Sequence, residues 1–395
     1  MKPNAVRKLA PEGMNIPYAL PYIGDDEITE AVAAIRSNWL SRGPRTGQFE
    51  AQFAAYAGSP HAIGLNSCTA GLHLAQLAYG IGPGDEVITT PYTFVATANT
   101  IVHCGATPVF VDIDPATMNL DPGLLEAAIT PRTKAIVPVH FAGYPCEMDA
   151  ILAIAEKHRL IVIEDAAHAV HTTYGGRMVG SIGHATCFSF YATKNLTTGE
   201  GGMVTTADEQ IADRIRAMSL HGMNKNAWNR YSDKGTWYYE VEFAGYKYNM
   251  TDIQAALGMV QLAKLERMHE LRSRYAAMYN AAFADQPAIV LPADAAGHRH
   301  AWHLYVIRLN SWMLRIDRAE FIGLLKEAGI GTSVHFIPVP MQPYYRRLGY
   351  RPEDYPAAME AYRGAVSLPL YPGMTEEQVH YVCDAVRSIL VGNRR

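Results

Sequence analysis

The sequence predicts an α/β protein whose large domain holds a mostly parallel sheet sandwiched by helices. Between about residues 58 and 215, short apolar runs rich in β-branched residues alternate with helix-like stretches. Strands that are apolar throughout and alternate with helices indicate a parallel sheet covered on both faces. The length of 395 residues leaves room for a second, smaller domain.

Seven apolar runs are the expected strands of this sheet. They are 62–66, 85–90, 107–113, 134–140, 160–165, 185–190 and 201–206. Helix-like segments lie between several of them, at 69–80, 94–105 and 148–159. In such a sheet the ligand chemistry is expected at the carboxyl ends of the strands.

One long helix is predicted over 251–284, where Thr251 is a plausible N-cap and apolar residues recur at near-helical spacing. A segment with many aromatic residues precedes it, with Trp228, Tyr231, Trp237, Tyr238 and Tyr239. We expect this helix to join a large cofactor-binding domain with an N-terminal arm, residues 1–262, to a small domain, residues 263–395.

The small C-terminal domain is expected to be α+β, because the pattern of the large domain ends there and the proportion of strands to helices changes. From about residue 286 the sequence predicts a linker, a strand at 303–309, a helix at 318–329, a strand at 332–339 and a final helix at 376–390. A loop rich in Pro and Tyr separates the last two elements.

Charge and cysteine usage narrow the classes of function. The formal net charge of −4 is too small for the basic surface that binds nucleic acid. The five cysteines are scattered and include no C-x-x-C pair, which favours a reducing compartment. The sequence shows neither a signal peptide nor an apolar run long enough to span a membrane, so we expect a cytoplasmic protein with no membrane partner.

Three segments carry residues that could do chemistry. Asp165 ends the apolar run 160–165, where a buried carboxylate needs a cationic or hydrogen-bonding partner, although helix capping is the commoner role of a lone Asp. Lys194 follows the run 185–190 and precedes a glycine-rich turn, where a desolvated amine could form a Schiff base with an aldehyde. For any single lysine, a solvated surface position is the commoner outcome.

The third segment, 66–72, joins a strand to a helix and is rich in small and hydroxyl residues. Such a helix start exposes backbone N–H groups and can bind a phosphate, although simple N-capping by Ser67 or Thr69 is equally compatible. A phosphate site, an acid and a lysine in this chain order match the needs of pyridoxal phosphate. Together the three segments say more than each does alone.

Other motifs argue against competing chemistry. The sequence has no G-x-G-x-x-G, no P-loop and no G-x-S-x-G nucleophile elbow. His298, His300 and His303 have a spacing that resembles a metal cluster, but they run from a linker into a strand, so we expect no metal site. Cys68 is interpreted as a small packing residue.

Nearly the whole chain resembles the DegT/DnrJ/StrS-type nucleotide-sugar aminotransferases, a branch of the fold-type I pyridoxal-phosphate enzymes. The matching segments are 39–44, 66–71, 91–97, 139–145, 164–169, 188–194, 245–256, 333–338 and 367–372. The resemblance implies the fold-type I architecture, a pyridoxal 5′-phosphate cofactor and a homodimer with sites shared between the subunits.

The resemblance also implies roles for individual residues. Lys194 matches the Schiff-base lysine and Asp165 matches the partner of the pyridine nitrogen. The other expected cofactor contacts are Thr69, Ala70 and Ser189 at the phosphate, Phe94 stacked on the ring, His168 near the phenolic oxygen, and Asn249 from the neighbouring subunit. Lys247 is an equally reachable candidate for that last contact. Lys247, His335 and Tyr344 are the candidates for substrate binding.

The implied reaction moves an amino group from an amino acid, with glutamate as the expected donor, to a nucleotide-linked keto-sugar. Segments 139–145 and 245–249 look most like the subgroup that aminates C4 of 4-keto-6-deoxy sugars for polysaccharide, glycan or antibiotic synthesis, and amination at C3 stays open. The alternatives are a pyridoxamine-dependent sugar dehydratase, a lyase or desulfurase, and a non-catalytic regulator. The dehydratases carry another residue in place of the lysine.

Overall fold

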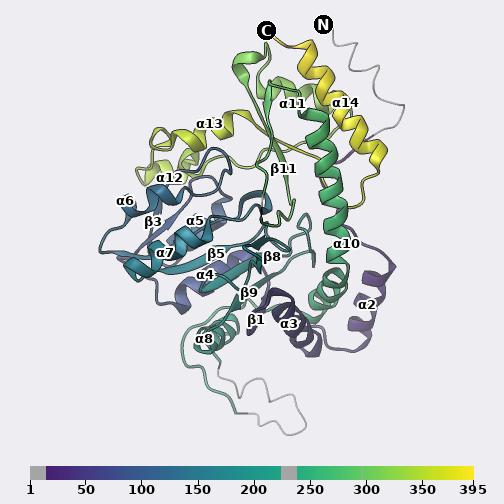
Figure 1. Ribbon diagram of the computed structural model, residues 1–395. Coiled ribbons are helices and arrows are strands. Elements are labelled where there is room, and N and C mark those ends of the chain that lie inside the picture. The colour runs from purple at the N-terminus through teal and green to yellow at the C-terminus, as the bar shows by residue number, and fades with distance from the viewer. Residues whose placement is uncertain (1–14, 224–237, 296) are drawn as a thin grey trace.

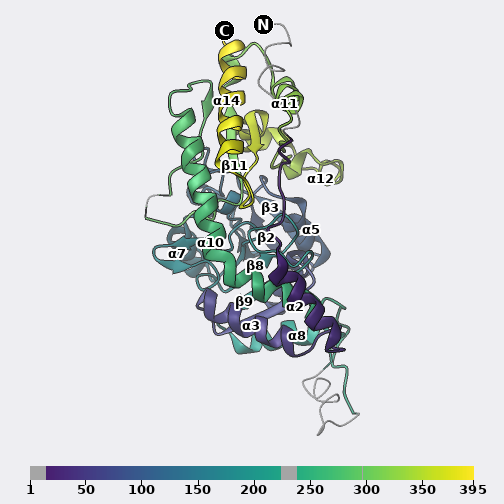
Figure 2. The same cartoon turned by 90° about the vertical axis from the view of Figure 1, so that its right-hand side faces the viewer.

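The computed structural model describes residues 15–223, 238–295 and 297–395, which form a large domain built on a seven-stranded sheet and a smaller domain above it (Figure 1). Turned by 90°, the same view shows the long helix α10 running alongside both domains (Figure 2). Trp228, Tyr231 and Trp237 lie outside the described residues. No helix among the described residues is long and apolar enough to cross a membrane.

The large sheet contains all seven predicted strands. In spatial order they are β1 (His61–Leu65), β9 (Gly202–Thr206), β8 (Ala185–Ser189), β5 (Ile161–Asp165), β4 (Thr133–Val137), β2 (Glu86–Thr89) and β3 (Thr107–Phe110). Strand β9 runs antiparallel to both of its neighbours, and every other pairing in the sheet is parallel. The predicted fold class is therefore confirmed.

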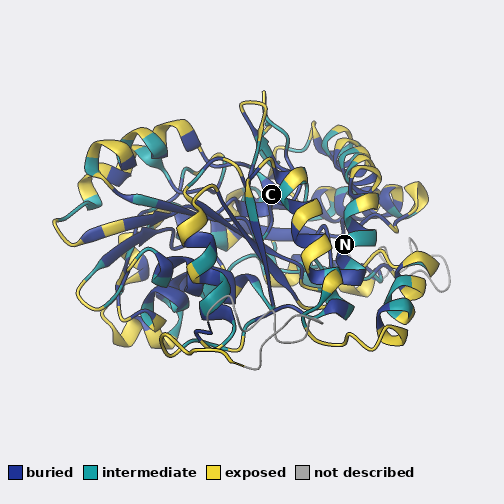
Figure 3. Cartoon of the chain, turned by 90° about the horizontal axis from the view of Figure 1, so that it is seen from below, coloured by how far each residue is buried: buried dark blue, intermediate teal, exposed yellow. Residues whose placement is uncertain are grey.

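Helices cover both faces of this sheet, because its strands alternate apolar side chains between the two faces. On one face Ile163 packs with residues of α4 (Cys68–Ala78), α5 (Val95–His103) and α8 (Glu209–Ser219). On the other face Val162 packs with residues of α3 (Pro44–Ala57), α7 (Met148–His158) and α10 (Asp252–Phe283). Seen from below, the strands form a buried centre between helices whose outer sides are exposed (Figure 3). The predicted helices at 69–80, 94–105 and 148–159 are α4, α5 and α7.

Helix α10 is the predicted long helix, and it begins with a capping box in which Thr251 and Gln254 exchange side-chain to backbone hydrogen bonds. The part of the helix up to Met268 contributes Leu265 and Met268 to the core of the large domain. The part from Leu271 onward contributes this residue, among others, to the core of the small domain. The two cores therefore change over within this helix, and the division at residues 262 and 263 stays a prediction.

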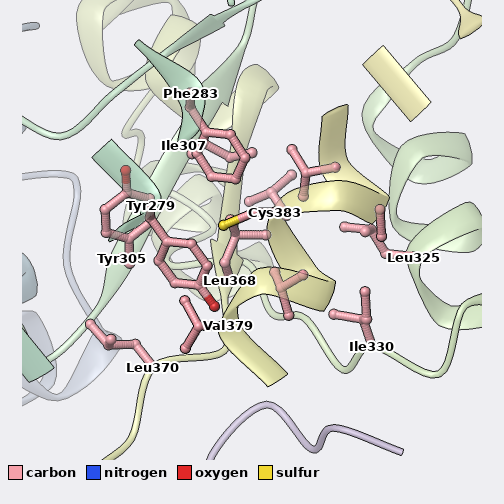
Figure 4. Packing of buried hydrophobic residues seen from close by; sticks show 14 of the residues in the cluster. Tyr279, Phe283, Tyr305, Ile307, Leu325, Ile330, Leu368, Leu370, Val379 and Cys383 are labelled. Carbon is pink, nitrogen blue, oxygen red and sulfur yellow. The ribbon is translucent and has the colours of Figure 1, made fainter. Parts of the chain in front are cut away.

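The small domain packs two helices against an antiparallel sheet of β10 (Ile289–Val290), β11 (Tyr305–Leu309) and β12 (Ala365–Leu368). The helices are α11 (Arg318–Glu327) and α14 (Glu376–Gly392), both of which the sequence predicts. Tyr279 and Phe283 of α10 close this core together with Cys383 of α14 (Figure 4).

The prediction of a strand at 332–339 is wrong. That segment pairs with the sheet only through one bridge between Ser333 and Ser367, and its last residue begins the 3-10 helix η4 (Val339–Met341). Pro338 and Pro340 have no N–H to donate to a ladder, which disfavours a regular strand there. The third strand of the small sheet is β12, a run of four residues that hydrophobic periodicity does not distinguish from a loop.

The remaining elements are short or lie at the edges of the two domains. They are α2 (Asp25–Arg36), η1 (Pro122–Leu124), α6 (Leu125–Ala128), η2 (Phe141–Gly143), β6 (Thr173–Tyr174), β7 (Arg177–Met178), η3 (Ser311–Met313), η4 (Val339–Met341), α12 (Pro343–Arg347), η5 (Pro352–Asp354) and α13 (Pro356–Gly364). Helix α2 packs on α10, whereas η2 follows β4 and lies next to the site described below.

Candidate active site

A cavity of about 460 Å³ opens where the carboxyl ends of β5 and β8 and the start of α4 meet the small domain. Seven of the predicted site residues line it: Thr69, Phe94, Asp165, His168, Ser189, Lys194 and His335. They come from both domains and from segments far apart in the sequence. The structure thus brings most of the predicted site together in one place.

Asp165 is the last residue of β5, and its carboxylate is buried at the wall of the cavity. Thr97 Oγ1 donates to Asp165 Oδ2 at 2.8 Å, and the Ala167 backbone N–H donates to Oδ1 at 3.1 Å. Burial raises the pKa of Asp165, while these two hydrogen bonds act in the opposite direction. Each oxygen keeps lone-pair capacity for a cationic partner in the cavity.

Lys194 lies in the turn after β8, where its backbone N–H donates to the Tyr191 carbonyl oxygen at 2.9 Å. Its side chain lines the same cavity as Asp165. Burial lowers the pKa of Lys194 to about 8, although the nearby Asp165 charge favours the protonated form. About a tenth of this amine is therefore a free base at pH 7, against less than about a thousandth for an ordinary lysine, and the free base is the form that a nucleophile or proton acceptor requires.

The start of α4 and the end of β8 form the expected phosphate cradle. Ser67 is the N-cap of α4, and its Oγ accepts from the Ala70 N–H at 3.1 Å. The Ala70 amide is thus already used by the cap, and Thr69 and Ser189 face the cavity. A Cβ added to Gly202 would lie 2.4 Å from the Ser67 carbonyl carbon, so β9 can approach this helix start only as glycine.

Three histidines line the side of the cavity nearest the small domain: His168, His303 and His335. The rings of His168 and His303 are 4.4 Å apart between centroids. Burial lowers the pKa of His168 and of His303 well below the ordinary value and that of His335 to about 4, so all three are neutral near neutral pH. Their hydrogen bonds then decide which nitrogen faces the cavity as a donor.

The tautomers of two of these histidines follow from their neighbours. His168 Nδ1 accepts from the Ala142 N–H at 3.2 Å, so its Nε2 carries the proton. Asn195 Nδ2 donates to the Ala301 carbonyl oxygen at 2.7 Å, which turns Asn195 Oδ1 toward His303 Nδ1 at 3.1 Å. His303 therefore holds its proton on Nδ1 and leaves Nε2 as an acceptor.

Two aromatic residues stand at the mouth of the cavity. Phe94, the N-cap of α5, is 59% exposed, and its ring centroid lies 6.0 Å from that of Phe336. His335 precedes Phe336 and is held by Ser367 Oγ, 2.8 Å from His335 Nδ1. An exposed ring beside an anion cradle can stack on a planar ligand.

Four predicted residues do not line this cavity: Ala70, Lys247, Asn249 and Tyr344. Lys247 and Asn249 hydrogen-bond each other on a segment that forms bridges to Leu220 and Leu65, and neither side chain lines the cavity. Tyr344 lines a second, more open hollow of about 450 Å³ together with Asn99 and others. The role of Tyr344 in substrate binding stays a prediction.

Two residues of the site, Thr97 and His303, are not predicted from the sequence as site residues. Thr97 lies on α5 and reaches Asp165, which is 68 positions away in the chain, so no local pattern marks it. His303 belongs to the triplet considered for a metal, and its ring lines the cavity. The other two members are packed on aromatic rings, His298 on Tyr174 and His300 on Trp302.

Neither a metal nor a thiolate is supported as the reactive group. Among the described residues, no cluster of three or more His, Cys, Asp or Glu side chains could hold a metal ion. Cys68 lines the cavity, but burial raises the pKa of its thiol well above the ordinary value, and the thiol donates to the Cys187 carbonyl oxygen at 3.4 Å. A protonated, buried thiol is a poor nucleophile.

The donor set of the cavity fits pyridoxal phosphate. A buried carboxylate can hold a protonated ring nitrogen, a partly deprotonated lysine can bond with an aldehyde, and the amides of a helix start with a neighbouring hydroxyl can bind a phosphate. Asp165, Lys194 and the cradle around Thr69 and Ser189 supply these three requirements in one cavity.

Comparison with known proteins agrees with this chemistry. The sequence profile of the DegT/DnrJ/EryC1/StrS aminotransferase family matches residues 21–387. The chain is 59% identical over 379 residues to the spore coat polysaccharide biosynthesis protein SpsC of Bacillus subtilis (strain 168), covering 95% of this chain and 97% of that protein.

Two solved structures are similar over almost the full length. The first is the pyridoxal-phosphate form of the putative sugar aminotransferase Spr1654 from Streptococcus pneumoniae, with a TM-score of 0.90, 35% identity, and coverage of 96% of this chain and 99% of that chain. The second is the Helicobacter pylori aminotransferase PseC, involved in the biosynthesis of pseudoaminic acid, with a TM-score of 0.89, 30% identity, and coverage of 96% and 100%.

Proposed function

The chain belongs to the DegT/DnrJ/EryC1/StrS aminotransferase family and is a pyridoxal-phosphate-dependent sugar aminotransferase; from this premise we propose its substrates. The amino donor is L-glutamate, and the acceptor is a nucleotide-linked 4-keto-6-deoxy sugar that becomes a 4-amino-4,6-dideoxy sugar. The product serves a surface polysaccharide, in line with the relative from spore coat polysaccharide synthesis.

The observation that carries the proposal is that Lys194 and Asp165 line one cavity beside the phosphate cradle. The bound cofactor supplies an aldehyde that accepts amines and a ring that withdraws electrons. Asp165 holds a proton on the ring nitrogen, because a buried carboxylate is stabilised by a cationic partner. Ser189 and the backbone amides at Thr69 bind the phosphate group and so fix the orientation of the ring.

Lys194 is the group that moves protons. With its pKa lowered to about 8, its Nζ can take the α-proton of the amino acid as a base. As an acid, the same Nζ can then give a proton to the carbon of the cofactor's aldehyde group. The same Nζ acts in the opposite direction when the keto-sugar is aminated.

The acceptor side of the cavity suits a sugar rather than a second charged group. His168 presents an N–H and His303 presents a bare nitrogen, so together they offer a donor and an acceptor to hydroxyl or carbonyl groups. His335 lines the same cavity and contacts the sugar nucleotide, whereas Phe94 stacks on the cofactor ring. The preference for C4 rests on the resemblance of segments 139–145 and 245–249 to the C4-aminating subgroup.

We further propose a cytoplasmic homodimer in which Lys247 or Asn249 of each subunit reaches the phosphate of the other. Neither lines the cavity of its own chain. Exposed apolar side chains near the start of the chain support a second copy as their cover: Leu20, Tyr22, Ile23, Ile28, Val32, Ile35, Trp39 and Leu40. The five free, buried cysteines suit a reducing compartment.

Incubation with L-glutamate and a panel of 4-keto-6-deoxy and 3-keto nucleotide sugars tests the proposed substrates. The expected product is a 4-amino sugar, identified by mass and NMR, together with 2-oxoglutarate. A 3-amino product would move the reaction to C3, and a deoxy-keto product without nitrogen would indicate a dehydratase. Turnover retained by Lys194→Ala would contradict the role of that amine, and no turnover with any sugar would favour a regulator.

A further inference from the structure

Two threonine hydroxyls on the N-terminal side of α5 form a chain that ends on Asp165. Thr93 Oγ1 lies 2.8 Å from Thr97 Oγ1, and Thr97 Oγ1 lies 2.8 Å from Asp165 Oδ2. Both threonines are almost completely buried, with exposed fractions of 2% and 1%. Water therefore cannot replace either hydrogen bond without rearrangement.

The direction of donation follows from counting protons. A carboxylate can only accept, so the single proton of Thr97 points to Asp165, and Thr93 donates to Thr97. The Phe94 carbonyl oxygen is the other acceptor near Thr97 Oγ1, but at 3.2 Å it is farther than the carboxylate and carries no full charge. Thr93 thus orients the hydroxyl that orients the acid.

This chain fixes the carboxylate together with one backbone amide. Thr97 holds Oδ2, and the Ala167 N–H holds Oδ1 at 3.1 Å, so both oxygens are located before any ligand binds. A hydrogen bond donated to a carboxylate stabilises its ionised form, and such a bond is stronger than one between neutral groups. Burial alone would favour the protonated form of Asp165.

We propose that Thr97 is a positioning residue that keeps Asp165 ionised and oriented, so that the shared proton resides on the ring nitrogen of the cofactor. Thr93 acts through Thr97 in the same sense. Without the Thr97 hydroxyl, the carboxylate becomes more basic and draws the proton toward itself. The ring then withdraws electrons less strongly when Lys194 removes the α-proton. This inference rests on the proposed roles of Asp165 and Lys194.

Thr97→Val removes the hydroxyl and keeps the shape of the side chain. The first readout is the ¹⁵N NMR signal of the ring nitrogen in holoenzyme loaded with labelled pyridoxal phosphate, followed as a function of pH. Where the carboxylate and the ring nitrogen share one proton, we expect the ¹⁵N signal of the variant to lie nearer that of an unprotonated ring than in the parent protein, because the proton moves within the pair. The second readout is kcat for the half-reaction with glutamate, expected to fall roughly tenfold with KM nearly unchanged.

Three companion variants separate positioning from packing. Thr97→Ser keeps the hydroxyl and should restore both readouts, and Thr93→Val should shift both in the same direction but less. Thr100→Val is the matched control: its buried hydroxyl is on the same helix and donates to the Thr97 carbonyl oxygen at 3.0 Å, away from the acid. It should leave the ¹⁵N titration unchanged.

An unchanged ¹⁵N titration in Thr97→Val would overturn the inference, as would an equal shift in Thr100→Val. These outcomes differ from failure of the proposed function, which would show as absence of a protonated ring nitrogen, or of glutamate turnover, in the parent protein itself. If Thr97→Val binds no cofactor, the test passes to Thr93→Val, and an unchanged titration there also overturns the inference.

Discussion

Glu164 and Asp165 are consecutive residues of β5, yet their carboxylates lie on opposite faces of the sheet, in two different environments. On one face Glu164 is completely buried and accepts from His140 Nε2 at 2.9 Å, Thr186 Oγ1 at 2.7 Å and the Gly183 N–H at 2.8 Å. On the other face Asp165 has two donors and a cavity in front of it.

The two environments shift the carboxylate pKa values in opposite directions. Burial opposes ionisation of both groups, but the donors around Glu164 outweigh it and lower its pKa, whereas the pKa of Asp165 is raised. A carboxylate that is saturated with donors holds the structure together, and one with spare capacity can respond to a ligand. Burial by itself therefore does not mark a functional acid; the unused lone pairs do.

The largest expected effect is on turnover, from Asp165→Asn. The amide keeps the shape but cannot hold a protonated ring nitrogen as a counter-charge, so kcat should fall about 1,000-fold. The free energy of unfolding of the cofactor-free protein should stay within about 1 kcal/mol of the parent value, because the variant removes a buried charge whose pKa is raised. Steady-state kinetics and urea unfolding check the two halves. A large loss of stability with intact kcat would erase the contrast with Glu164.

Glu164→Ala should show the reverse pattern. It leaves three buried donors without an acceptor, and we expect the free energy of unfolding to fall by about 3 kcal/mol. The kcat of the folded protein should change little. Since the pKa of Glu164 is lowered on folding, this contribution is present above about pH 4 and is lost as the pH falls further. Urea unfolding at several pH values measures it.

An exposed carboxylate gives the control for that experiment. Glu126 contacts Lys157 and His158, but its side chain is 49% exposed. Glu126→Ala should therefore leave the unfolding curve unchanged, because solvent screens such pairs. If Glu126→Ala and Glu164→Ala lower the free energy of unfolding equally, the burial of Glu164 and its donors does not make their interaction stronger.

Burial and the Asp165 charge, which act in opposite directions on the pKa of Lys194, also set the reactivity of this amine. Only the neutral amine reacts with pyridoxal phosphate. The rate at which the cofactor-free protein binds it should therefore rise about tenfold for each pH unit up to about pH 8 and stay constant above that pH. Asp165→Asn should move this inflection to lower pH, since the Asp165 charge favours the protonated amine. Glu164→Gln, on the other face, should not move it. Stopped-flow absorbance follows the reaction.

The smallest effect concerns one donor of the saturated carboxylate. Thr186→Val removes the hydroxyl that donates to Glu164 and should lower the free energy of unfolding by about 1 kcal/mol. Thr205→Val is the matched variant on the neighbouring strand, where the hydroxyl donates to the uncharged Gly180 carbonyl oxygen at 2.8 Å. The loss in Thr205→Val should be smaller. Equal losses would show that the charge of the acceptor does not matter here.

The sequence predicts what adjoining residues encode. Each of the seven large-sheet strands is a local apolar run. Asp165 ends one such run and Lys194 lies in the turn after another, so the fold class and the reactive residues follow from local pattern. Thr97 and His303 act through contacts between distant segments, which periodicity does not contain. The strand that the sequence predicts at 332–339 is wrong because the apolar residues of this segment line the cavity and pack at the junction with the large domain instead of joining a ladder.

The continuity of α10 limits how the two domains can move. A helix of 32 residues is about 48 Å long, and here its two halves are built into separate cores. A sharp bend in α10 would break backbone hydrogen bonds at the point where the cores change over. The helix therefore connects the two domains rigidly and does not act as a hinge. A chain cut within α10 would therefore lose side chains from both cores. Neither fragment should fold when it is expressed alone.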